Sequence, residues 1–498
     1  MVIIRSLSNI YFLLTYLPFL IFEVILVLYD ATTSNKLDSA VIKTGIPEKL
    51  LMMRAASSVW NIVEKLAKVS RVFSIAGPGN NGGDAYGVAI FSAISGYNTL
   101  IYSTKEPSGT SKKIAEFCFA LGADKLRFLP DPNEISCDDV IIDGLLGSGL
   151  NRPPTDHYLD VIEWINVSRK NGAKVIAIDI PSGLNASTGS TPGTAVKADF
   201  TMMCLSQKQG CFTGTGPDLC GNLSYANLGI EKPESLVDPT SLLISYGNEG
   251  VIKRPRSGHK GTFGSVLIIG GWPPMEGAGC MAGLAALRAG AGKVYVCGPS
   301  FPECPLELIS VKRDLGQVDE LLDQVDAVVA GPGLGKGADC FLEKAWASGT
   351  PLILDADGLN WLSESKAGRR QAYWIGTPHP GEARTLLGEE ISDRFLALEK
   401  LQSKYGGVWV LKGAGTLVGP KPTYVNPLAD SILATAGSGD ILAGLIGGLT
   451  AQRLESPEIY GVWLHGKAAE YLKSNGQSTL LATDLLPAVS KVMKVVEA

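Results

Sequence analysis

The sequence lacks several features that would place it in well-known classes of protein. Its nine cysteines contain no C-x-x-C pair, which argues against both a zinc site and a disulfide framework. The formal net charge of -5 offers no positive field for nucleic acid, so we expect no nucleic-acid partner. Charged residues make up 19% of the chain and hydrophobic residues 45%, a balance typical of globular proteins. A globular protein in a reducing compartment fits this composition best.

The N-terminal segment departs from that composition. Residues 10–29 are almost all apolar and about as long as a membrane span requires, although Pro18 and Glu23 interrupt them. A membrane anchor or signal segment, a genuine extension, and upstream sequence translated from a mis-assigned start are three alternatives. We favour the third, because amphipathic sequence begins at about Asp30 and no small-residue cleavage site precedes it. We therefore expect a cytoplasmic protein, with a membrane partner only if residues 1–29 are genuine.

The length of 498 residues exceeds what one hydrophobic core usually organises, so we expect two domains. In both halves, runs rich in Val and Ile alternate with amphipathic segments, as in βαβ units around a parallel sheet. The strands predicted in the first half are 71–76, 98–103, 140–143, 174–180 and 198–204. Those in the second half are 264–271, 293–297, 327–330, 352–355 and 408–411, with late helices at 441–452 and 462–473.

Between the two series the pattern fades. We place a linker at 238–256, where no strong helical period is present and a basic KRPRSGHK segment follows. The first domain then covers 30–237 and the second 257–498. The halves share an α/β architecture but no common order of motifs, so the sequence shows no internal repeat.

A glycine loop, GPGNNGGDAYGVA, follows the first predicted strand. Gly77, Gly79 and Gly82 satisfy the G-x-G-x-x-G pattern of dinucleotide-binding folds. The acidic ribose ligand of that fold is missing, because the only candidate, Glu106, lies late and before a proline. A Rossmann dehydrogenase is therefore disfavoured. The Asn and Asp side chains of NNGGD could instead coordinate a cation beside a helix N-terminus that binds phosphate, although a simple Asx-capped turn is the alternative.

Two more loops follow later strands of the first half. One contains Asp143 in DGLLGSGL, and the other contains Asp179 and Ser182 in DIPSG. Each aspartate could merely cap the next helix. Because the carboxyl ends of parallel strands share one edge of a sheet, however, we expect the three loops to meet. Together they offer a hard-cation site and a general acid/base carboxylate beside an anion-binding loop.

The second half lacks the GxxxxGK[ST] phosphate loop, and a different glycine motif takes its place. In ATAGSGD, the amides at Gly437 and Gly439 open a helix whose dipole favours an anion, and Asp440 can accept a proton from an attacking hydroxyl. The alternative is a glycine turn capped by Asp440. The KGAGT segment at 412–416 adds a cation and turn amides suited to nucleotide phosphates, unless Lys412 is only a solvated strand end.

Two further segments of the second half resemble site loops. TPHPGE carries His379 and Glu382 on a proline-held turn, where a histidine is less often core packing than on an apolar helix face. GPGLG, at 331–335, allows the backbone to approach a ligand closely. We expect the remaining helix histidines to be structural: His157 and His465.

In this order, the motifs NNGGD, DGLLGSGL, DIPSG, HKGTFG, GPGLG, TPHPGE, KGAG and GSGD resemble those of the bifunctional NAD(P)H-hydrate repair enzymes. The resemblance covers nearly everything from Asp30 onward. It implies an α/β protein with an N-terminal Rossmann-like doubly wound domain, an epimerase of hydrated NADH and NADPH. A ribokinase-like α/β domain, an ADP-dependent dehydratase of the same hydrate, would follow. The resemblance is compatible with a homo-oligomer.

For the first domain, the resemblance implies a potassium ion held by Asn81, Asp143 and Ser182, and a catalytic role for Asp179. It also implies that the following residues contact the hydrate: Asn80, Asn81, Gly82, Gly83, Asp84, Gly147, Ser148, Gly149, Leu150, Asn151, Arg152, Pro153 and Asp179.

For the second domain, the resemblance implies that Asp440 is catalytic and that the hydrate is faced by Ala278, Gly333, His379 and Asp440. The nucleotide would be held by Lys412, Gly413, Ala414, Gly415, Thr416 and Gly439. ADP would phosphorylate the C6 hydroxyl of the hydrate so that phosphate can leave, giving AMP, with magnesium shielding the charge.

One position departs from the family pattern, which usually has glycine after NNGGD, where this chain has Ala85. If position 85 required a positive φ, alanine would be strained by about 1 kcal/mol or more. That strain would lower epimerase efficiency. The main alternative function is a small-molecule kinase of the ribokinase type with an N-terminal binding module, since it would share the GSGD motif and the fold.

Overall fold

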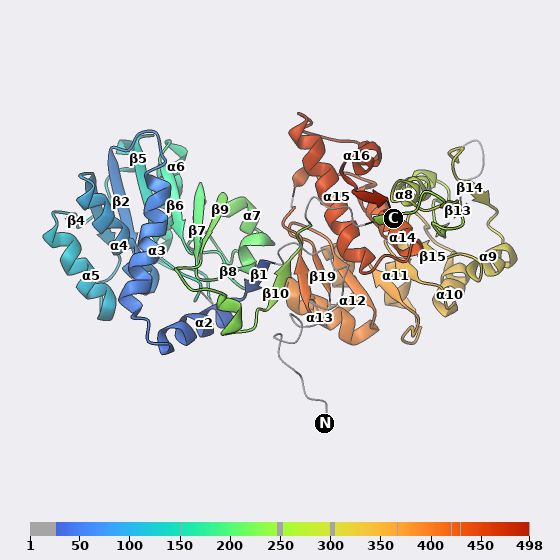
Figure 1. The fold of residues 1–498 in the computed structure, drawn as a ribbon, viewed down its shortest axis with the longest axis horizontal. Coiled ribbons are helices and arrows are strands. Elements are labelled where there is room, and N and C mark those ends of the chain that lie inside the picture. The colour runs from blue at the N-terminus through green and yellow to red at the C-terminus, as the bar shows by residue number, and fades with distance from the viewer. Residues whose placement is uncertain are drawn as a thin grey trace, which may run out of the picture. The chain divides into compact units, whose positions relative to one another are not determined.

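The computed structural model describes residues 26–150, 152–246, 252–298, 304–365, 367–419, 421–428 and 430–497. Residues 1–25 of the N-terminal segment, and Asn151 among the predicted site residues, lie outside them. The chain forms two compact units, Val27–Ser241 and Leu242–Ala498 (Figure 1). Within the described residues, no helix is both long and apolar enough to cross a membrane.

The first unit is built on a parallel seven-stranded sheet in the order β4-β3-β2-β5-β6-β7-β9. The order reverses between β2 and β5, which makes their carboxyl ends the position where open α/β sheets bind ligands. The strands are β2 (Arg71–Ala76), β3 (Asn98–Ser103), β4 (Asp124–Leu126), β5 (Asp139–Gly144), β6 (Lys174–Ile178), β7 (Phe200–Cys204) and β9 (Asn222–Ala226).

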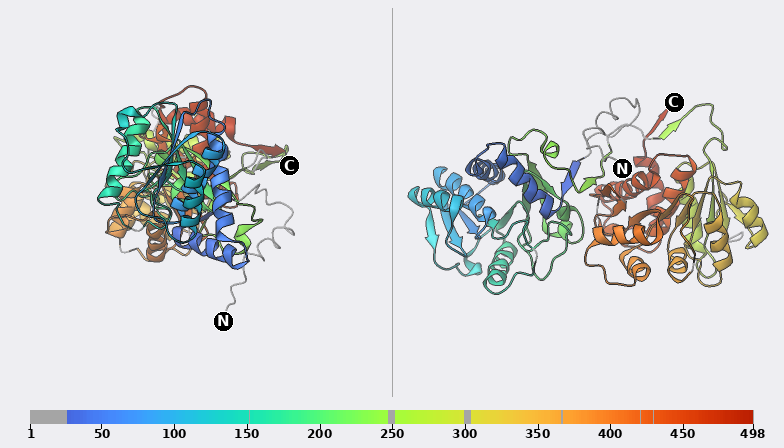
Figure 2. Two further views of the ribbon diagram at one scale, coloured as in Figure 1. Left: turned by 90° about the vertical axis from the view of Figure 1, so that its left-hand side faces the viewer. Right: turned by 90° about the horizontal axis from the view of Figure 1, so that it is seen from below.

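Two hydrophobic cores cover the two faces of this sheet, because successive strand residues point to opposite sides. Val72 packs with one group of helices, whereas its neighbour Phe73 packs against the other face. The first core is closed by α3 (Glu48–Val63), α4 (Asn80–Ile94) and α5 (Gly109–Ala120), the second by α6 (His157–Lys170) (Figures 1 and 2). Short elements complete the unit: η1 (Pro132–Glu134), η2 (Gln209–Phe212), α7 (Gly216–Leu219) and η3 (Pro233–Ser235).

The unit begins before Asp30. Strand β1 (Leu26–Tyr29) pairs in parallel with β8 (Gln207–Lys208), and the side chains of Leu28 and Tyr29 are buried. Helix α2 (Ala31–Lys43) follows directly, with the Asp30 carboxylate accepting a hydrogen bond of 2.6 Å from the Thr33 amide. A boundary at Asp30 therefore leaves out a strand of the first unit.

The second unit contains a sheet in the order β14-β13-β12-β15-β16-β17-β18-β19-β20, parallel as far as β18 and antiparallel beyond it. Its order reverses between β12 and β15, the strands that precede the GGWPP and GPGLG loops. The strands are β12 (Ser265–Ile269), β13 (Lys293–Cys297), β14 (Ile309–Val311), β15 (Ala327–Ala330), β16 (Leu352–Leu354), β17 (Trp374–Gly376), β18 (Val408–Leu411), β19 (Leu417–Gly419) and β20 (Thr423–Val425).

Helices also cover both faces of the second sheet. One core joins Val266 and Val329 of the strands to the helices α8 (Glu276–Arg288), α14 (Ser438–Ala451), α15 (Pro457–Ser474) and α16 (Leu485–Val492). On the other face, Trp374 and Trp409 form a ring cluster with Trp346 and Trp361. The helices of this second group are α9 (Leu315–Leu322), α10 (Asp339–Ala347), α11 (Asp357–Glu364), α12 (Pro380–Leu387) and α13 (Arg394–Tyr405).

Each segment predicted as a strand coincides with one: five of the ten match exactly, and the ends of the others differ by one or two residues. Strand β6 stops at Ile178 and not at 180, because Asp179 has a φ of 67° and turns the chain out of the sheet. Glycines with positive φ similarly bound β12, at Gly264 and Gly271. The late helices are longer than 441–452 and 462–473 suggest.

The predicted linker at 238–256 is not wholly irregular. Its described residues include β10 (Ser241–Leu243) and β11 (Ile252–Arg254), and 247–251 lie outside the described residues. Strand β11 pairs with β21 (Val495–Glu497) near the end of the second unit, so part of the linker belongs to that unit. The second unit also contains two short 3₁₀ segments, η4 (Ser431–Leu433) and η5 (Ala482–Asp484).

Two candidate active sites

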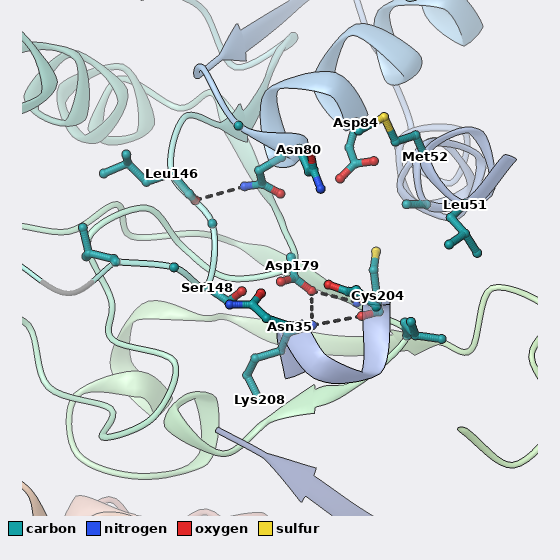
Figure 3. Close-up of a pocket in the computed structure, with 18 of the residues that line it drawn as sticks. Asn35, Leu51, Met52, Asn80, Asp84, Leu146, Ser148, Asp179, Cys204 and Lys208 are labelled. Carbon is teal, nitrogen blue, oxygen red and sulfur yellow. Dashed lines mark hydrogen bonds and ion pairs between the residues drawn. The ribbon is translucent and has the colours of Figure 1, made fainter. Parts of the chain in front are cut away.

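A cavity of about 530 Å³ opens at the carboxyl ends of the first sheet (Figure 3). The three loops predicted to meet do meet here, joined by side chains from α2 and α3. Nine of the residues expected at the hydrate line the cavity: Asn80, Asn81, Asp84, Gly147, Ser148, Gly149, Leu150, Arg152 and Asp179.

Three other residues expected at the hydrate do not line this cavity. A Cβ on Gly82 would lie 1.9 Å from the Gly77 carbonyl oxygen, and one on Gly83 would lie 2.5 Å from Ser111 Oγ. Gly82 thus lets α4 pack closely on the backbone of Gly77, whereas the atoms nearest to Gly83 are the ends of side chains. Pro153 is exposed, follows the lining residue Arg152 and is likewise absent from the lining.

A buried lysine pairs with Asp179 in the cavity. The Lys208 ammonium forms an ion pair with Asp179 and donates hydrogen bonds of 2.9 Å and 3.0 Å to the carbonyls of Cys204 and Ser206. The Cys204 amide donates to the same Asp179 oxygen at 3.1 Å. These contacts fix the orientation of the Asp179 carboxylate. The sequence did not point to Lys208, whose only signal is a lysine within the mostly uncharged segment LSQKQGCF.

Three more carboxyl groups line the same cavity, those of Asp38, Glu48 and Asp84. Burial raises the pKa of Asp38, on α2, to about 6; Lys208 opposes this shift and Asp179 adds to it. Burial also raises the pKa of Asp84 well above its usual range, and the charges of Asp179 and Asp38 raise it further. The cavity therefore holds carboxyl groups with different tendencies to ionise, as sites for acid/base chemistry do.

The predicted potassium ligands lie together next to this cavity, and one of them, Asn81, lines it. The Ser182 hydroxyl and amide donate to the two oxygens of Asp143 at 2.6 Å and 2.9 Å. The Leu146 amide donates to Ser182 Oγ at 2.8 Å, while Asn81 Nδ2 donates to the Leu146 carbonyl at 3.0 Å. The set supplies only oxygen donors with a single carboxylate, which fits a hard cation of low charge.

The expectation of strain at Ala85 is wrong. Ala85 lies within α4 and is not among the residues with positive φ, so its right-handed backbone suits alanine. A glycine is required not at position 85 but at position 144, where the chain packs against Ala85. A Cβ on Gly144, at the end of β5, would lie 2.7 Å from the Ala85 Cβ and 2.6 Å from the Asn81 carbonyl oxygen. Gly144 therefore allows the Asp143 loop to pack directly on the NNGGD helix.

In the second unit, four charged groups gather around the start of α14. Asp440 lies in the first turn, after Gly437 with a φ of 91°. Lys412 pairs with Asp355 at 2.7 Å and approaches Glu382 to 3.8 Å. Burial raises the pKa of Asp440 to about 7, with Asp355 adding to the shift and Lys412 opposing it. Asp440 is thus an acid/base group that titrates near neutrality.

The guanidinium of Arg394 donates hydrogen bonds to backbone carbonyls of the KGAGT loop. One guanidinium nitrogen donates to the carbonyls of Ala414 and Gly415 at 2.6 Å and 3.1 Å. The other donates to those of Leu411 and Lys412 at 3.0 Å and 3.1 Å. Because the carbonyls are engaged from one side, the loop is fixed in a turn. Arg394 was not predicted, since nothing local links it to a loop that begins 18 positions later.

Three of the residues predicted to face the hydrate in the second unit, Ala278, Gly333 and His379, have contacts within the protein. A Cβ on Gly333, whose φ is 56°, would lie 2.8 Å from the Ala278 Cβ, so these two are neighbours. His379 caps α12: its Nδ1 accepts from the Gly381 amide at 3.0 Å, and its side chain stays 57% exposed. His465 is buried, as expected of a structural residue, and burial lowers its pKa to about 4.

Both units match families of known proteins. Residues 266–491 match a family described as NAD(P)H-hydrate dehydratase, and residues 48–210 match the YjeF-related protein N-terminus family. The bifunctional NAD(P)H-hydrate repair enzyme Nnr of Coxiella burnetii is 38% identical to the chain, covering 93% of it and 98% of the relative. The Nnr protein of Escherichia coli is 34% identical, with 89% of each chain covered.

Among solved structures, the chain is similar to an ADP/ATP-dependent NAD(P)H-hydrate dehydratase from Bacillus subtilis, crystallised with ATP and Mg²⁺. The two are 28% identical with a TM-score of 0.44, and the match covers 49% of this chain and 93% of the other.

Proposed function

Since the chain belongs to the family of bifunctional NAD(P)H-hydrate repair enzymes, we propose that its two sites act in sequence on hydrated NADH and NADPH. The first unit interconverts the R and S forms of the hydrate. The second dehydrates the S form to NAD(P)H and converts ADP to AMP and phosphate. The observation that supports this proposal best is the presence of an aspartate beside a glycine loop that opens a helix in each unit, Asp179 in the first and Asp440 in the second.

In the first site, Lys208 and the Cys204 amide hold the Asp179 carboxylate toward the cavity. A carboxylate fixed in this way can exchange a proton with the oxygen bound to C6 of the hydrate. The amides at the start of α4 and the 147–150 loop would receive the phosphates. We assign hydrate binding to the lining residues and keep Gly82, Gly83 and Pro153 as further proposed contacts of the hydrate.

We propose potassium as the cation of this site, held by Asn81, Asp143 and Ser182 together with the carbonyl of Leu146. A bound potassium ion would supply positive charge beside the phosphates of the hydrate. The residues themselves tie three loops together, because Asp143 contacts the loop of Ser182 and Asn81 contacts the loop of Leu146. Loss of any one of them would loosen the phosphate end of the cavity.

In the second site, Asp440 accepts the proton of the C6 hydroxyl as that oxygen attacks the terminal phosphate of ADP. Lys412 and the turn amides of the KGAGT loop, with Gly439, would hold the nucleotide. The carboxylates of Asp355, Glu382 and Asp440 would supply the oxygen ligands for a magnesium ion shared with the phosphates. Magnesium would supply the charge that shields the transferred phosphoryl group.

The test supplies the pure R epimer of hydrated NADH, with and without ADP, and follows the return of NADH absorbance. We expect recovery only with ADP, and recovery from the R epimer only while the first site is active. Phosphorylated vitamins or sugar alcohols as the main product would instead indicate the small-molecule kinase. A cytoplasmic location and domain limits near 237 and 257 remain predictions, with the first domain extended to Leu26.

A further inference from the structure

Inversion at C6 of the hydrate requires the hydroxyl to leave from one face of the ring and to be added on the opposite face. The hydroxyl on C6 is attached next to ring nitrogen N1, whose lone pair can expel it once it is protonated. The planar N1=C6 iminium that results is open to water from either side. An enzyme that inverts this carbon in one binding event therefore benefits from an acid on one face and a base on the other.

The cavity of the first unit presents carboxyl groups from two directions. Asp84 comes from α4 and Asp179 from the loop that follows β6. In Figure 3 the Asp84 carboxyl lies near Met52, while that of Asp179 lies across the cavity beside Cys204 and Lys208. Both residues line the same space, which is large enough for a nicotinamide ring.

The two carboxyl groups have different partners. Asp179 is ion-paired with Lys208 and accepts a hydrogen bond from the Cys204 amide, contacts that favour its charged form. Among the described residues, no group hydrogen-bonds or ion-pairs with the Asp84 side chain. Burial raises the pKa of Asp84, as do the facing carboxyls of Asp179, Asp38 on α2 and Glu48 on α3, while Lys208 on β8 lowers it. The thiol of Cys204, at the end of β7, also lines the cavity near Asp84 and Asp179 and is titratable. Two carboxyls with opposed environments are the usual arrangement of an acid and a base.

We propose that Asp84 is the general acid and Asp179 the general base of an epimerisation in which the C6 oxygen is exchanged with solvent. This inference rests on the proposed epimerase activity and adds its chemistry. Asp84 gives its proton to the C6 hydroxyl, the C6–O bond breaks, and water leaves as N1=C6 forms. A second water then attacks the opposite face, the new C6–O bond forms, and its proton passes to Asp179.

The proton balance closes without a co-reactant. After one inversion Asp84 is ionised and Asp179 is protonated, which is the state required for the reverse inversion. Proton exchange with solvent returns the site to its starting state. No electrons are gained or lost, because N1 recovers its lone pair when water adds.

The test is epimerisation of the pure R hydrate in H₂¹⁸O, with the spontaneous exchange in enzyme-free buffer subtracted. We expect one ¹⁸O atom at C6 in each molecule of S hydrate formed. Inversion by opening and closing of the ring would keep the original oxygen, and S hydrate without ¹⁸O would overturn the proposal. A parent that forms no S hydrate at all would contradict the proposed function, not this mechanism.

Variants separate Asp84 from the other carboxyls. Asp84→Asn should slow epimerisation by about 10²-fold or more and abolish the fall in kcat/KM at alkaline pH, because the parent acid works only while protonated. Asp124→Asn removes an exposed carboxyl on β4, outside the cavity lining, and should behave like the parent. Thermal unfolding of the variants, compared with the parent, reports on the folding of the first unit. An Asp84→Asn rate within a few-fold of the parent would refute the assignment.

Discussion

The ammonium of Lys412 lies 2.7 Å from Oδ1 of Asp355, and the Asp355 side chain is only 2% exposed. A second hydrogen bond, from Thr377 Oγ1 at 2.7 Å, reaches the same oxygen. The lysine therefore has two tasks, because it neutralises a buried carboxylate and also stands at the loop proposed to hold the nucleotide. Its removal should affect both stability and binding.

Lys412→Met is expected to lower the free energy of unfolding by about 3–5 kcal/mol, since it leaves the charge of Asp355 buried without its partner. It should also raise the KM for ADP. Lys421→Met is the control, because the Lys421 and Glu399 side chains of that pair are 79% and 50% exposed. Exposed pairs contribute about 0–1 kcal/mol. Urea unfolding followed by tryptophan fluorescence compares the two variants, and equal losses would contradict the structural role of Lys412.

Asp440→Asn should slow dehydration by about 10²–10⁴-fold and leave epimerisation unchanged, because the amide cannot accept a proton. The parent rate should rise with pH through about 7, since burial raises the pKa of Asp440 to about 7 and a base acts only when ionised. Asp314→Asn is the control, as Asp314 caps α9 with a bond to the Gln317 amide. If both variants keep dehydrating at the parent rate, Asp440 has no part in the reaction.

Arg394→Lys is expected to raise the KM for ADP at least about tenfold with a smaller change in kcat. A lysine keeps the charge but cannot replace the forked set of four bonds that holds the KGAGT loop. Arg453→Lys, at a side chain 86% exposed, serves as the comparison. Steady-state kinetics with varied ADP measures the effect. An unchanged KM would show that the turn keeps its shape without the guanidinium.

Asp143→Ala should abolish epimerisation and its dependence on potassium, because the carboxylate both binds the proposed ion and fixes Ser182. The rates are measured in potassium, sodium and lithium buffers. The parent should be fastest in potassium. Asp124→Ala, which removes an exposed carboxylate at the edge of the same sheet, should behave like the parent. Equal parent rates in all three buffers would remove potassium from the mechanism.

A fragment of residues 26–241 should be more stable than one of residues 30–241. The shorter fragment loses β1, whose Leu28 and Tyr29 side chains are at most 1% exposed. Complete burial of such a side chain contributes about 1.5–3 kcal/mol. Thermal unfolding of both fragments checks this, with epimerase activity as a measure of native structure. Identical melting temperatures would show that the N-terminal strand adds nothing.

The sequence predicted the sheets and the loops of both sites because these depend on local patterns. Apolar runs mark the strands, and the glycine motifs at their ends mark positive φ or close packing, as at Gly144 and Gly437. Strand β1 escaped prediction for the same reason that the others were found. It ends an apolar run so long that its composition resembles a membrane segment.

Groups that act through long-range contacts could not be read from the sequence. Lys208 is 29 positions from Asp179, and only the folded chain brings the two side chains together. The same holds for Arg394 and for Asp355, which lies 57 positions before Lys412. The close contact between Gly82 and the Gly77 carbonyl could not be read from the sequence either, because a glycine motif does not say which neighbour approaches it.

The contact between Ala85 and Gly144 implies that these two positions cannot vary independently. A Cβ on residue 144 would lie 2.7 Å from the methyl group already present on residue 85, so only one of the two can carry a side chain at this spacing. Reversal to glycine at 85 would still leave the Asn81 carbonyl 2.6 Å from any such Cβ. The constraint is therefore one-sided: position 85 is free to lose its methyl group, whereas position 144 is not free to gain one.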